Sequence, residues 1–389
     1  MKFVVLGGTG MMGRIVVKDL FEMSKGSEII IASNDKEKAR SMAEGYKSSR
    51  VTGFGINVKE INATSRLLEG SDVALNCVQY YFNLDVMKAA LKARTNYLDL
   101  GGLFYVTREQ LRLHRQFLRN NLIAILGVGS TPGITNVLAR YGASMLDEVY
   151  EMHVKVGSRD YSRVTNPSSF MVPYSMETIL DEFTKEPIVY TKGRIRKVKP
   201  LSGLEVVNFP KPVNEVTGFY TLHSELATFP SSFRNRGLKE ASFRVAFAHD
   251  FVEKIKFLVS AGLASSEPVE VGDVRIVPRK VLVKVINELP KPIIKRLEDY
   301  EFLRVDMKGR KKGKKVRMFV DCLARAKPEW NAAAGDMDTG TPPSIVAQMI
   351  ADNKIQEKGV LPPELCIEPL SFFKELEKRG MKVSIRYQK

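Results

Sequence analysis

The sequence is poor in the residues that build disulfide frameworks and metal sites. Its 389 residues include three cysteines, four histidines and a single tryptophan. The cysteines, Cys77, Cys322 and Cys366, are far apart and none belongs to a C-x-x-C pair, which argues against a zinc ribbon or a redox dithiol. A sparse, odd set of cysteines is typical of a reducing compartment, so we expect a cytoplasmic protein without a bound metal.

Long apolar runs are also missing. No stretch reaches the roughly 18–20 residues that a membrane span requires. The apolar run at residues 3–6 ends at glycines and is followed by no cleavage-site pattern, unlike a signal peptide. We therefore expect no membrane association. With 44% hydrophobic and 27% charged residues, the composition is that of a folded protein, and the length suits two domains.

Acidic residues are fewer than basic ones, at 44 against 60, which gives a net charge of +16. Such an excess attracts anions, either nucleic acids or smaller molecules such as a dinucleotide. The densest basic run, residues 308–315, lies between two segments with strand character, 300–307 and 316–323. This pattern predicts the tip of a β-hairpin. No aromatic residue interrupts the run, so we expect no nucleic-acid partner.

A glycine-rich turn follows the first predicted strand directly. Residues 2–6 form a short β-branched run, and apolar residues at helical spacing occupy 14–23. Between them Gly8, Gly10 and Gly13 fit G-x-G-x-x-G in the strand–turn–helix context that dinucleotide binding requires. The glycines permit the tight turn, the approach of a pyrophosphate and close packing of the helix on the strand. The predicted cofactor-binding residues here are Gly8, Thr9, Gly10, Met11, Met12 and Gly13.

The end of the second predicted strand, residues 28–33, bears on the choice between NAD and NADP. An acidic residue at this position grips the ribose 2′-hydroxyl in NAD enzymes. Here Ser33 occupies it, Asn34 and Asp35 follow, and Lys36 comes next. A neutral residue near basic ones would not repel a 2′-phosphate, which favours NADP slightly. Asp35 is either a helix cap or, by a local shift, a ribose ligand.

Strands and helices continue to alternate as far as residue 126. Strands are predicted at 72–78, 96–100 and 122–126, and helices at 84–93 and 107–121. This order predicts an α/β fold with a Rossmann-type doubly wound parallel sheet. Ligands bind such sheets at the carboxyl ends of the strands. We therefore expect Cys77 and Val78 at the cofactor, and residues 99–102 and 127–133 at the rim of the site.

At this point the sequence resembles the saccharopine dehydrogenase-like family, in particular its lysine 6-dehydrogenase-like branch. Five segments carry the resemblance: Gly-Gly-Thr-Gly-Met-Met-Gly at 7–13, Asn-Cys-Val-Gln-Tyr-Tyr-Phe-Asn at 76–83, Asn-Tyr-Leu-Asp-Leu-Gly-Gly at 96–102, Gly-Val-Gly-Ser-Thr-Pro-Gly-Ile-Thr-Asn at 127–136 and Asp-Thr-Gly-Thr-Pro at 338–342. The resemblance spans most of the chain.

The resemblance implies a discontinuous domain order. Residues 1–145 would form the dinucleotide-binding domain, 146–325 an α+β substrate and dimerisation domain, and 326–389 a segment that returns to the first domain. The sequence agrees, with long strands predicted at 244–248 and 280–286. A helix is predicted from Thr341, with Pro342 and Pro343 in its first turn. Residues 381–387 predict an edge strand, and the family implies a homodimer.

The resemblance also implies a reaction at a C–N bond of an amino-acid substrate, in which hydride transfer to NAD or NADP interconverts an amine and an imine. Lysine is the first predicted substrate. The alternatives are saccharopine or a carboxylated polyamine, as in a carboxynorspermidine dehydrogenase-type reductase. A non-catalytic dinucleotide-binding sensor is a hypothesis of another class.

Such a reaction needs a proton acceptor near neutral pH. His223 and Glu225 are two residues apart in a segment predicted to be extended, so both would face the same ligand, with Glu225 orienting His223. A solvent-facing pair is the alternative. Asp99 is a second candidate, because a carboxylate at a strand end next to two glycines could bind the substrate ammonium. Hydrogen bonds to loop amides are its alternative.

Four further residues are predicted to contact the substrate. Arg244 alternates with apolar residues and suits bidentate binding of a carboxylate, unless it is an exposed strand residue. Tyr80 and Tyr81 follow a predicted strand and would flank the nicotinamide, or else pack in the core. Thr131 belongs to the loop at 127–133, on the rim of the site.

Overall fold

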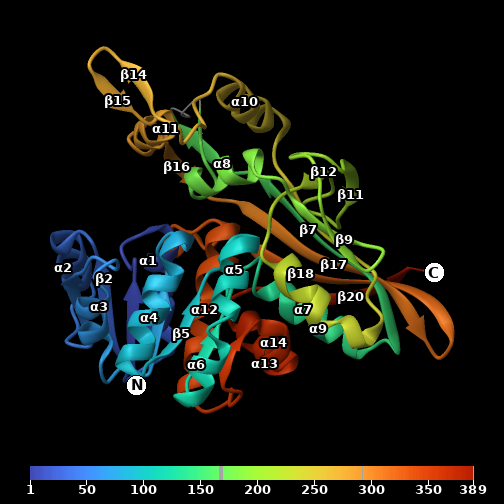
Figure 1. Ribbon diagram of the computed structural model, residues 1–389, viewed down its shortest axis with the longest axis horizontal. Helices are drawn as coiled ribbons and strands as arrows, with labels where there is room; N and C mark the ends of the chain where they lie inside the picture. The colour runs from blue at the N-terminus through green and yellow to red at the C-terminus, as the bar shows by residue number, and fades with distance from the viewer. Residues whose placement is uncertain (166–169, 291, 389) are drawn as a thin grey trace.

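Two β-sheets organise the protein, and the computed structural model describes residues 1–165, 170–290 and 292–388 (Figure 1). A seven-stranded sheet with its helices forms the first, Rossmann domain. A nine-stranded sheet forms the second domain. Within the described residues, no helix combines the length and the apolar character that a membrane span needs.

The first sheet is parallel throughout and runs in the order β19-β6-β5-β4-β1-β2-β3. The order changes direction on either side of β1, which confirms the predicted doubly wound fold. Its strands are β1 (Lys2–Leu6), β2 (Glu28–Ser33), β3 (Val51–Gly55), β4 (Val73–Asn76), β5 (Asn96–Asp99), β6 (Ile123–Ile125) and β19 (Gly359–Leu361). The buried β-branched and leucine side chains of β1 and β2 show why this sheet is central to the core.

Helices cover both faces of this sheet. They are α1 (Met11–Met23), α2 (Lys36–Gly45), α3 (Ile61–Leu68), α4 (Asn83–Ala93), α5 (Leu103–Leu111), α6 (His114–Arg119), α7 (Ile134–Ser144) and α12 (Ala334–Ala351). The single helix expected at 107–121 is two short helices, because a turn at Arg112 and Leu113 separates α5 from α6. α7 leaves the Rossmann domain and leads into the second sheet.

The second sheet is mixed and runs in the order β10-β9-β13-β7-β17-β18-β20. β7 (Glu148–Asp160), β17 (Asp299–Lys311) and β18 (Lys314–Arg325) are its long strands, and β13 (Glu240–Ala246) lies beside β7. The predicted hairpin around the basic run is confirmed, since β17 and β18 are antiparallel neighbours joined at Lys312 and Gly313. The shorter strands are β9 (Ile188–Thr191), β10 (Arg194–Lys197), β11 (Glu205–Asn208) and β12 (Glu215–Tyr220).

The two faces of the second sheet differ in polarity. Val154, Val156, Leu303 and Val305 are buried on the inner face, the face that packs on α7 and α12. The alternate residues of the same strands include Lys155 and Arg304, which lie on the outer face. The inner face therefore supplies the apolar contact that joins the two domains.

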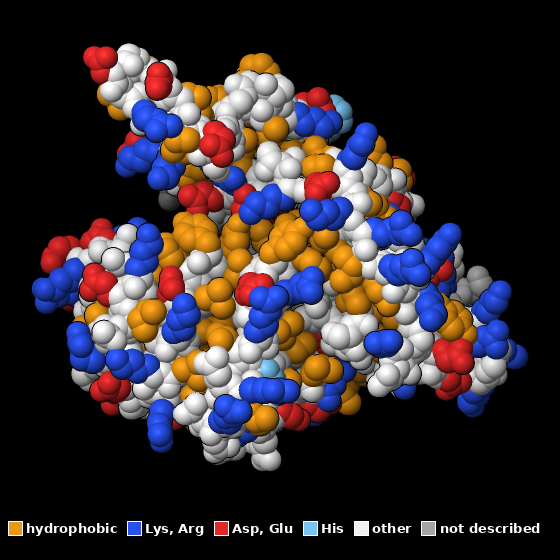
Figure 2. All heavy atoms as spheres, in the orientation of Figure 1, with side chains coloured by type: hydrophobic (Ala, Val, Ile, Leu, Met, Phe, Trp, Pro, Cys, Tyr) orange, Lys and Arg blue, Asp and Glu red, His pale blue; other side chains and the backbone are white. Residues whose placement is uncertain are grey.

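Part of the second domain overhangs the Rossmann domain. This overhang consists of α8 (Met176–Thr184), α10 (His249–Ser260), α11 (Pro278–Asn287) and the hairpin β14–β15 (Val269–Val271 and Val274–Ile276), with the pair β8 (Arg163–Thr165) and β16 (Ile293–Arg296) beside them. Figure 2 shows an open hollow beneath it, with apolar side chains gathered on its inner walls.

Two further element predictions are wrong, each for a local reason. Residues 280–286 form helix α11 and not a strand, because Leu282 and Ile286 bury one helical face and Pro278 starts the helix. α12 begins at Ala334, seven residues before the predicted start, so Pro342 and Pro343 lie inside it. Since proline has no N–H, the carbonyls of Asp338 and Thr339 receive no bond from the residue four positions ahead.

The C-terminal segment contributes to both sheets. β19 pairs with β6 at the edge of the Rossmann sheet, and β20 (Lys382–Gln388) pairs with β18 at the edge of the second sheet. Between them lie α13 (Pro363–Cys366) and α14 (Pro369–Lys378). Just after α14, Arg379 donates from Nε and Nη2 to the two carboxylate oxygens of Asp19 in α1, each at 2.8 Å.

This ion pair gives the first prediction. Both side chains are buried, and burial raises the pKa of Asp19 despite the attraction of Arg379. Arg379→Met should lower the free energy of unfolding by about 3–5 kcal/mol, because it leaves a buried carboxylate without its cation. Denaturant unfolding of the variant measures this loss.

Two further variants complete the experiment. The double variant Asp19→Leu/Arg379→Met should regain most of the lost stability, since no unpaired charge remains. Lys378→Met, which removes an exposed ion pair with Glu375, should cost less than about 1 kcal/mol. Equal losses for Arg379→Met and Lys378→Met would contradict the assignment.

Candidate active site

The glycine turn between β1 and α1 has the geometry of a phosphate-binding loop. A Cβ on Gly13 would lie 2.2 Å from the carbonyl oxygen of Gly7, and one on Gly8 would lie 3.0 Å from Ile31. Gly10 is the N-cap of α1 and offers no side chain to the free amides of the first turn, at Met11 and Met12. These amides and the space above them fit the pyrophosphate of a dinucleotide.

The end of β2 lies beside this loop. The hydroxyls of Thr9 and Ser33 are 2.9 Å apart, and Ser33 accepts a hydrogen bond from the amide of Asp35 at 3.2 Å. Asp35 accepts from the amide of Lys38 and thus caps α2, which is one of the two roles considered for it. Asn34 is exposed. A surface depression nearby is lined by residues that include Lys36, Arg40, Lys47 and Gly55.

Cys77 and Val78 lie against the same loop. A Cβ on Gly7 would lie 2.9 Å from the backbone carbonyl of Cys77 and 3.0 Å from Val78. Burial raises the pKa of the Cys77 thiol to about 12, so this residue remains a neutral thiol at physiological pH. Both residues thus border the glycine turn, and their contact with a cofactor stays a prediction.

Asp99, at the end of β5, lies at the centre of a hydrogen-bond network. Its carboxylate accepts from the amides of Gly101 at 2.9 Å and Gly127 at 2.8 Å. It also accepts from the side chains of Tyr97, Asn83 and Gln110. Burial raises the pKa of Asp99, and these hydrogen bonds oppose the rise. Asp99 has no exposed surface, and with five hydrogen-bond donors it holds the loops after β5 and β6 in place. This is the alternative role considered for it, a carboxylate bonded to loop amides.

His223 and Glu225 come together where the second domain meets those loops. Nδ1 of His223 forms a short hydrogen bond with Oε2 of Glu225, and Oε1 of Glu225 accepts from Thr135 at 2.9 Å. Ser224, between them, donates to the carbonyl of Leu103 at 3.1 Å. The pair is buried, which excludes the solvent-facing alternative.

The predicted reason for this contact differs from the observed one. The segment is not an extended strand: β12 ends at Tyr220, and Glu225 is the first residue of α9 (Glu225–Ser232). The imidazole of His223 stacks on Phe243 of β13, with ring centroids 3.7 Å apart. Because Glu225 accepts the Nδ1 proton, Nε2 is the nitrogen left to accept a proton from a substrate.

One buried acid, Glu182, lies near His223, and a second acid, Glu301, lies beyond it; the sequence patterns singled out neither. Glu182 of α8 is buried, and its carboxylate forms a short hydrogen bond with the hydroxyl of Tyr174. Burial raises the pKa of Glu182 to about 7, although the nearby charge of His223 lowers it. Burial raises the pKa of the Tyr174 hydroxyl well above its ordinary value, and the charges of Glu182 and of Glu301, in β17, raise it further.

The predicted substrate residues of the Rossmann domain lie at the domain boundary. Tyr80, in the short helix η1 (Tyr80–Phe82), donates to Asp181 of α8 at 2.6 Å and accepts from Lys185 at 2.8 Å. Tyr81 is half-exposed, with its hydroxyl 3.5 Å from Glu177. Thr131 is half-buried in the loop after β6. Tyr80 thus joins the Rossmann domain to the second domain.

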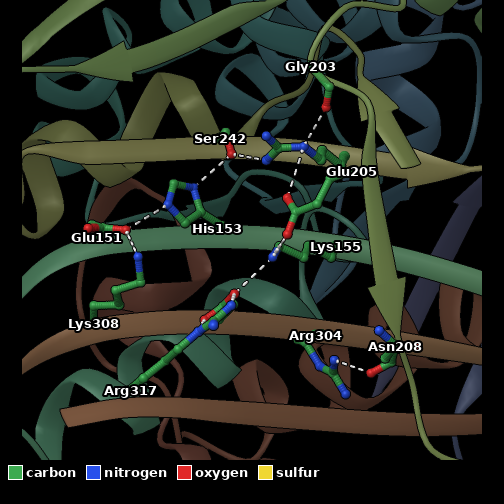
Figure 3. A network of polar contacts seen from close by, with 12 residues as sticks. Glu151, His153, Lys155, Gly203, Glu205, Asn208, Ser242, Arg304, Lys308 and Arg317 are labelled. Carbon is green, nitrogen blue, oxygen red and sulfur yellow. Dashed lines mark hydrogen bonds and ion pairs between the residues drawn. The ribbon is translucent and has the colours of Figure 1, made fainter. Parts of the chain in front are cut away.

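Arg244 does not match its predicted role. It follows Phe243, which stacks on His223, so its side chain lies on the outer face of the sheet. There it donates to Gly203, Ser242 and Tyr220, and pairs with Glu205. Figure 3 shows this network, in which Glu205 also contacts Lys155 and Ser242 contacts His153. Arg244 is therefore on the opposite side of the sheet from His223.

Glu182 gives a second prediction. Its pKa of about 7 lies above the ordinary 4.5, so the folded protein binds more protons than the unfolded chain between these values. The contribution of this group to the free energy of unfolding is greatest below about pH 4.5 and is lost as the pH rises through about 7. When the pH rises from about 5.5 to 7.5, the free energy of unfolding of Glu182→Gln should fall by about 2 kcal/mol less than that of the wild type.

Denaturant unfolding at the two pH values measures this difference. Glu186→Gln is the matched control, because Glu186 is an exposed carboxylate just after the same helix, paired with Lys197. The control should keep the pH dependence of the wild type. The same dependence in the Glu182→Gln variant would contradict the prediction.

The sequence matches two family models that together cover most of the chain. The saccharopine dehydrogenase NADP binding domain matches residues 3–125, and the saccharopine dehydrogenase C-terminal domain matches residues 129–381. Among curated proteins, the carboxyaminopropylagmatine dehydrogenase of Synechocystis is 23% identical, over 97% of this chain and 96% of that protein. The carboxynorspermidine synthase of Vibrio cholerae is 22% identical, over 75% and 74%.

Solved structures agree in fold over the whole chain. The apo saccharopine dehydrogenase (L-Glu forming) of Saccharomyces cerevisiae gives a TM-score of 0.76 at 16% identity, with full coverage of both chains. The homospermidine synthase of Legionella pneumophila, solved with NAD, gives 0.71 at 15% identity, covering 100% of this chain and 91% of that one. The chain belongs to the saccharopine dehydrogenase family of NAD(P)-dependent oxidoreductases.

Proposed function

We propose that this protein is an NAD(P)-dependent dehydrogenase that interconverts an amine and an imine in a carboxylated polyamine. The observation that carries the proposal is the buried His223–Glu225 pair, held against the loops at the carboxyl end of the dinucleotide-binding sheet. A nicotinamide at this end of the sheet would supply the hydride chemistry. His223 would accept or return the proton of the substrate nitrogen, with Glu225 fixing its tautomer.

The names of the relatives favour a carboxylated polyamine as the substrate. Two of them are named for carboxylated polyamines, carboxyaminopropylagmatine and carboxynorspermidine. This supports the alternative considered from the sequence over its first prediction, a lysine 6-dehydrogenase. A substrate with several ammonium groups also suits the buried acids near His223, because no lysine or arginine among the described residues forms an ion pair with Glu182.

NADP is the proposed cofactor. Ser33 replaces the acidic residue that would repel a 2′-phosphate, and Asp35 is occupied in capping α2. Lys36 and Arg40 line the depression beside the end of β2. NAD stays an alternative, since the solved homospermidine synthase holds NAD.

Oxidation assays test the substrate. Purified protein is mixed with NADP or NAD and, in turn, with carboxyaminopropylagmatine, carboxynorspermidine, saccharopine and lysine, and the absorbance of the reduced nicotinamide is followed. We expect turnover with a carboxylated polyamine and a higher kcat/KM with NADP than with NAD. Turnover with lysine or saccharopine alone would overturn the proposed substrate. Cofactor binding without any turnover would favour the sensor hypothesis.

His223→Gln tests the proton acceptor. We expect kcat to fall by about 10²–10⁴-fold, the usual contribution of a general base, with cofactor affinity unchanged. His153→Gln is the matched control, because His153 lies on the outer face of the second sheet, bonded to Ser242. Steady-state kinetics and fluorescence titration of the cofactor measure both effects. Similar rates for the two variants would contradict the role of His223.

A further inference from the structure

Glu301 and Asp338 form a pair of acids that the proposed chemistry does not use. Asp338 lies in α12 and is fully buried. Glu301 lies near the start of β17 and directs its carboxylate to the same stretch of α12, since a Cβ on Gly335, one turn before Asp338, would lie 3.7 Å from Oε2 of Glu301. The Oδ2 atom of Asp338 has no hydrogen-bond partner among the described residues, and its Oδ1 atom accepts only from Thr339, at 3.4 Å. Neither acid forms an ion pair with a described lysine, arginine or histidine.

Two neighbouring carboxyl groups cannot both be ionised without a counter-charge. Loss of solvation raises the pKa of Glu301 to about 7, and it raises the pKa of Asp338 well above its ordinary value. The nearby negative charge of Glu301 raises the pKa of Asp338 further. Below about pH 7, at least one of the two carboxyl groups is therefore protonated when no counter-charge is present.

The surroundings of the pair supply acceptors and few donors. Pro342 and Pro343 deprive the carbonyls of Asp338 and Thr339 of their usual partners within the helix. The carboxylate of Asp299 is close enough to raise the pKa of both acids. A group with three N–H donors and a positive charge, an alkylammonium, matches such a set of acceptors.

The position of the pair connects it with the candidate active site. Thr339, next to Asp338, lies with its hydroxyl 3.0 Å from that of Ser130, in the loop after β6. Glu301 is close enough to Tyr174 for its charge to affect that hydroxyl. Tyr174 in turn forms a hydrogen bond with Glu182, and Glu182 is near His223. The acids thus continue from His223 along the inner face of the second sheet to the N-terminal half of α12.

We propose that Glu301 and Asp338 bind a protonated amino group of the substrate, separate from the nitrogen that reacts beside His223. The ammonium enters already charged, both carboxyl groups become ionised against it, and the protons that they held pass to solvent. The subsite selects long substrates with a second cationic centre. The inference rests on the proposed function for the identity of the substrate, and the binding experiment below does not require turnover.

Spermidine is the probe for this subsite. Isothermal titration of the full-length protein with bound NADP, at about pH 6 in two buffers with different ionisation enthalpies, gives the affinity and the number of protons released. The wild type should release at least one proton per spermidine bound. Asp338→Asn and Glu301→Gln should each release fewer protons than the wild type and bind spermidine at least about tenfold more weakly, one charge-assisted contact being removed.

Two controls define the measurement. Asp352→Asn removes an exposed carboxylate just past the other end of α12 and should behave as the wild type. n-Butylamine, which carries one ammonium and no second cationic centre, should bind weakly and with the same affinity in all variants. Thermal denaturation should show that Asp338→Asn and Glu301→Gln fold, with melting temperatures no lower than that of the wild type, because a buried repulsion is removed.

The outcomes separate the two proposals. Spermidine binding with Asp338-dependent proton release, but no oxidation of any carboxylated polyamine, would overturn the proposed function and keep the subsite. Oxidation by the wild type with unchanged spermidine affinity and proton release in both variants would overturn the subsite. Lower melting temperatures with unchanged binding would make the pair a structural link between α12 and β17, which also overturns it. If Asp338→Asn fails to fold, Glu301→Gln alone decides.

Discussion

The carboxylate of Asp99 receives hydrogen bonds from both of the loops that carry the candidate site. Through Gly101 and Gly127 it fixes the chain after β5 and after β6. A Cβ on Gly101 would lie 3.1 Å from Pro132 and 3.5 Å from Ser224, so these loops and the His223 segment leave little free space between them. The position of His223 relative to the glycine turn thus depends on a residue that is fully buried beneath both loops.

The carboxylates on the two faces of the second sheet differ in their cationic partners. On the outer face each buried carboxylate has two cations: Asp306 accepts from Lys155 and Arg317, and Asp321 from Arg304 and Arg386. On the inner face, Glu182, Glu301 and Asp338 have none among the described residues. The strands that carry these cations on the outer face place none of them on the side that faces the Rossmann domain. The acids without a cationic partner are therefore found on the side that faces the Rossmann domain.

The features that depend on neighbouring residues were predictable from the sequence. The glycine turn, its strand and its helix are encoded within about twenty residues, and the parallel sheet follows from the alternation that comes after them. His223 and Glu225 were brought together correctly, although a helix start and not a strand causes the contact. Asp99 was located correctly at a strand end, but its five hydrogen-bond donors could not be predicted from the sequence.

Features that depend on long-range packing could not be read in this way. Alternation shows that Arg244 and Phe243 face opposite sides of a sheet, but not which side meets the cofactor domain. The β-branched residues of 280–286 suit a strand, yet the burial of Leu282 and Ile286 selects a helix. Glu182, Glu301 and Asp338 are dozens of residues apart in sequence, and only the return of α12 to the inner face brings the last two together.

The path of the final residues has a consequence for how the chain tolerates shortening. β19 covers the edge of β6 in one sheet, and β20 covers the edge of β18 in the other. Loss of the chain after α12 would uncover both edges at once and would expose their unpaired N–H and C=O groups. Open strand edges are templates for intermolecular pairing. A nonsense or frameshift mutation between α12 and β19 would therefore yield a chain prone to aggregate, not a shortened enzyme.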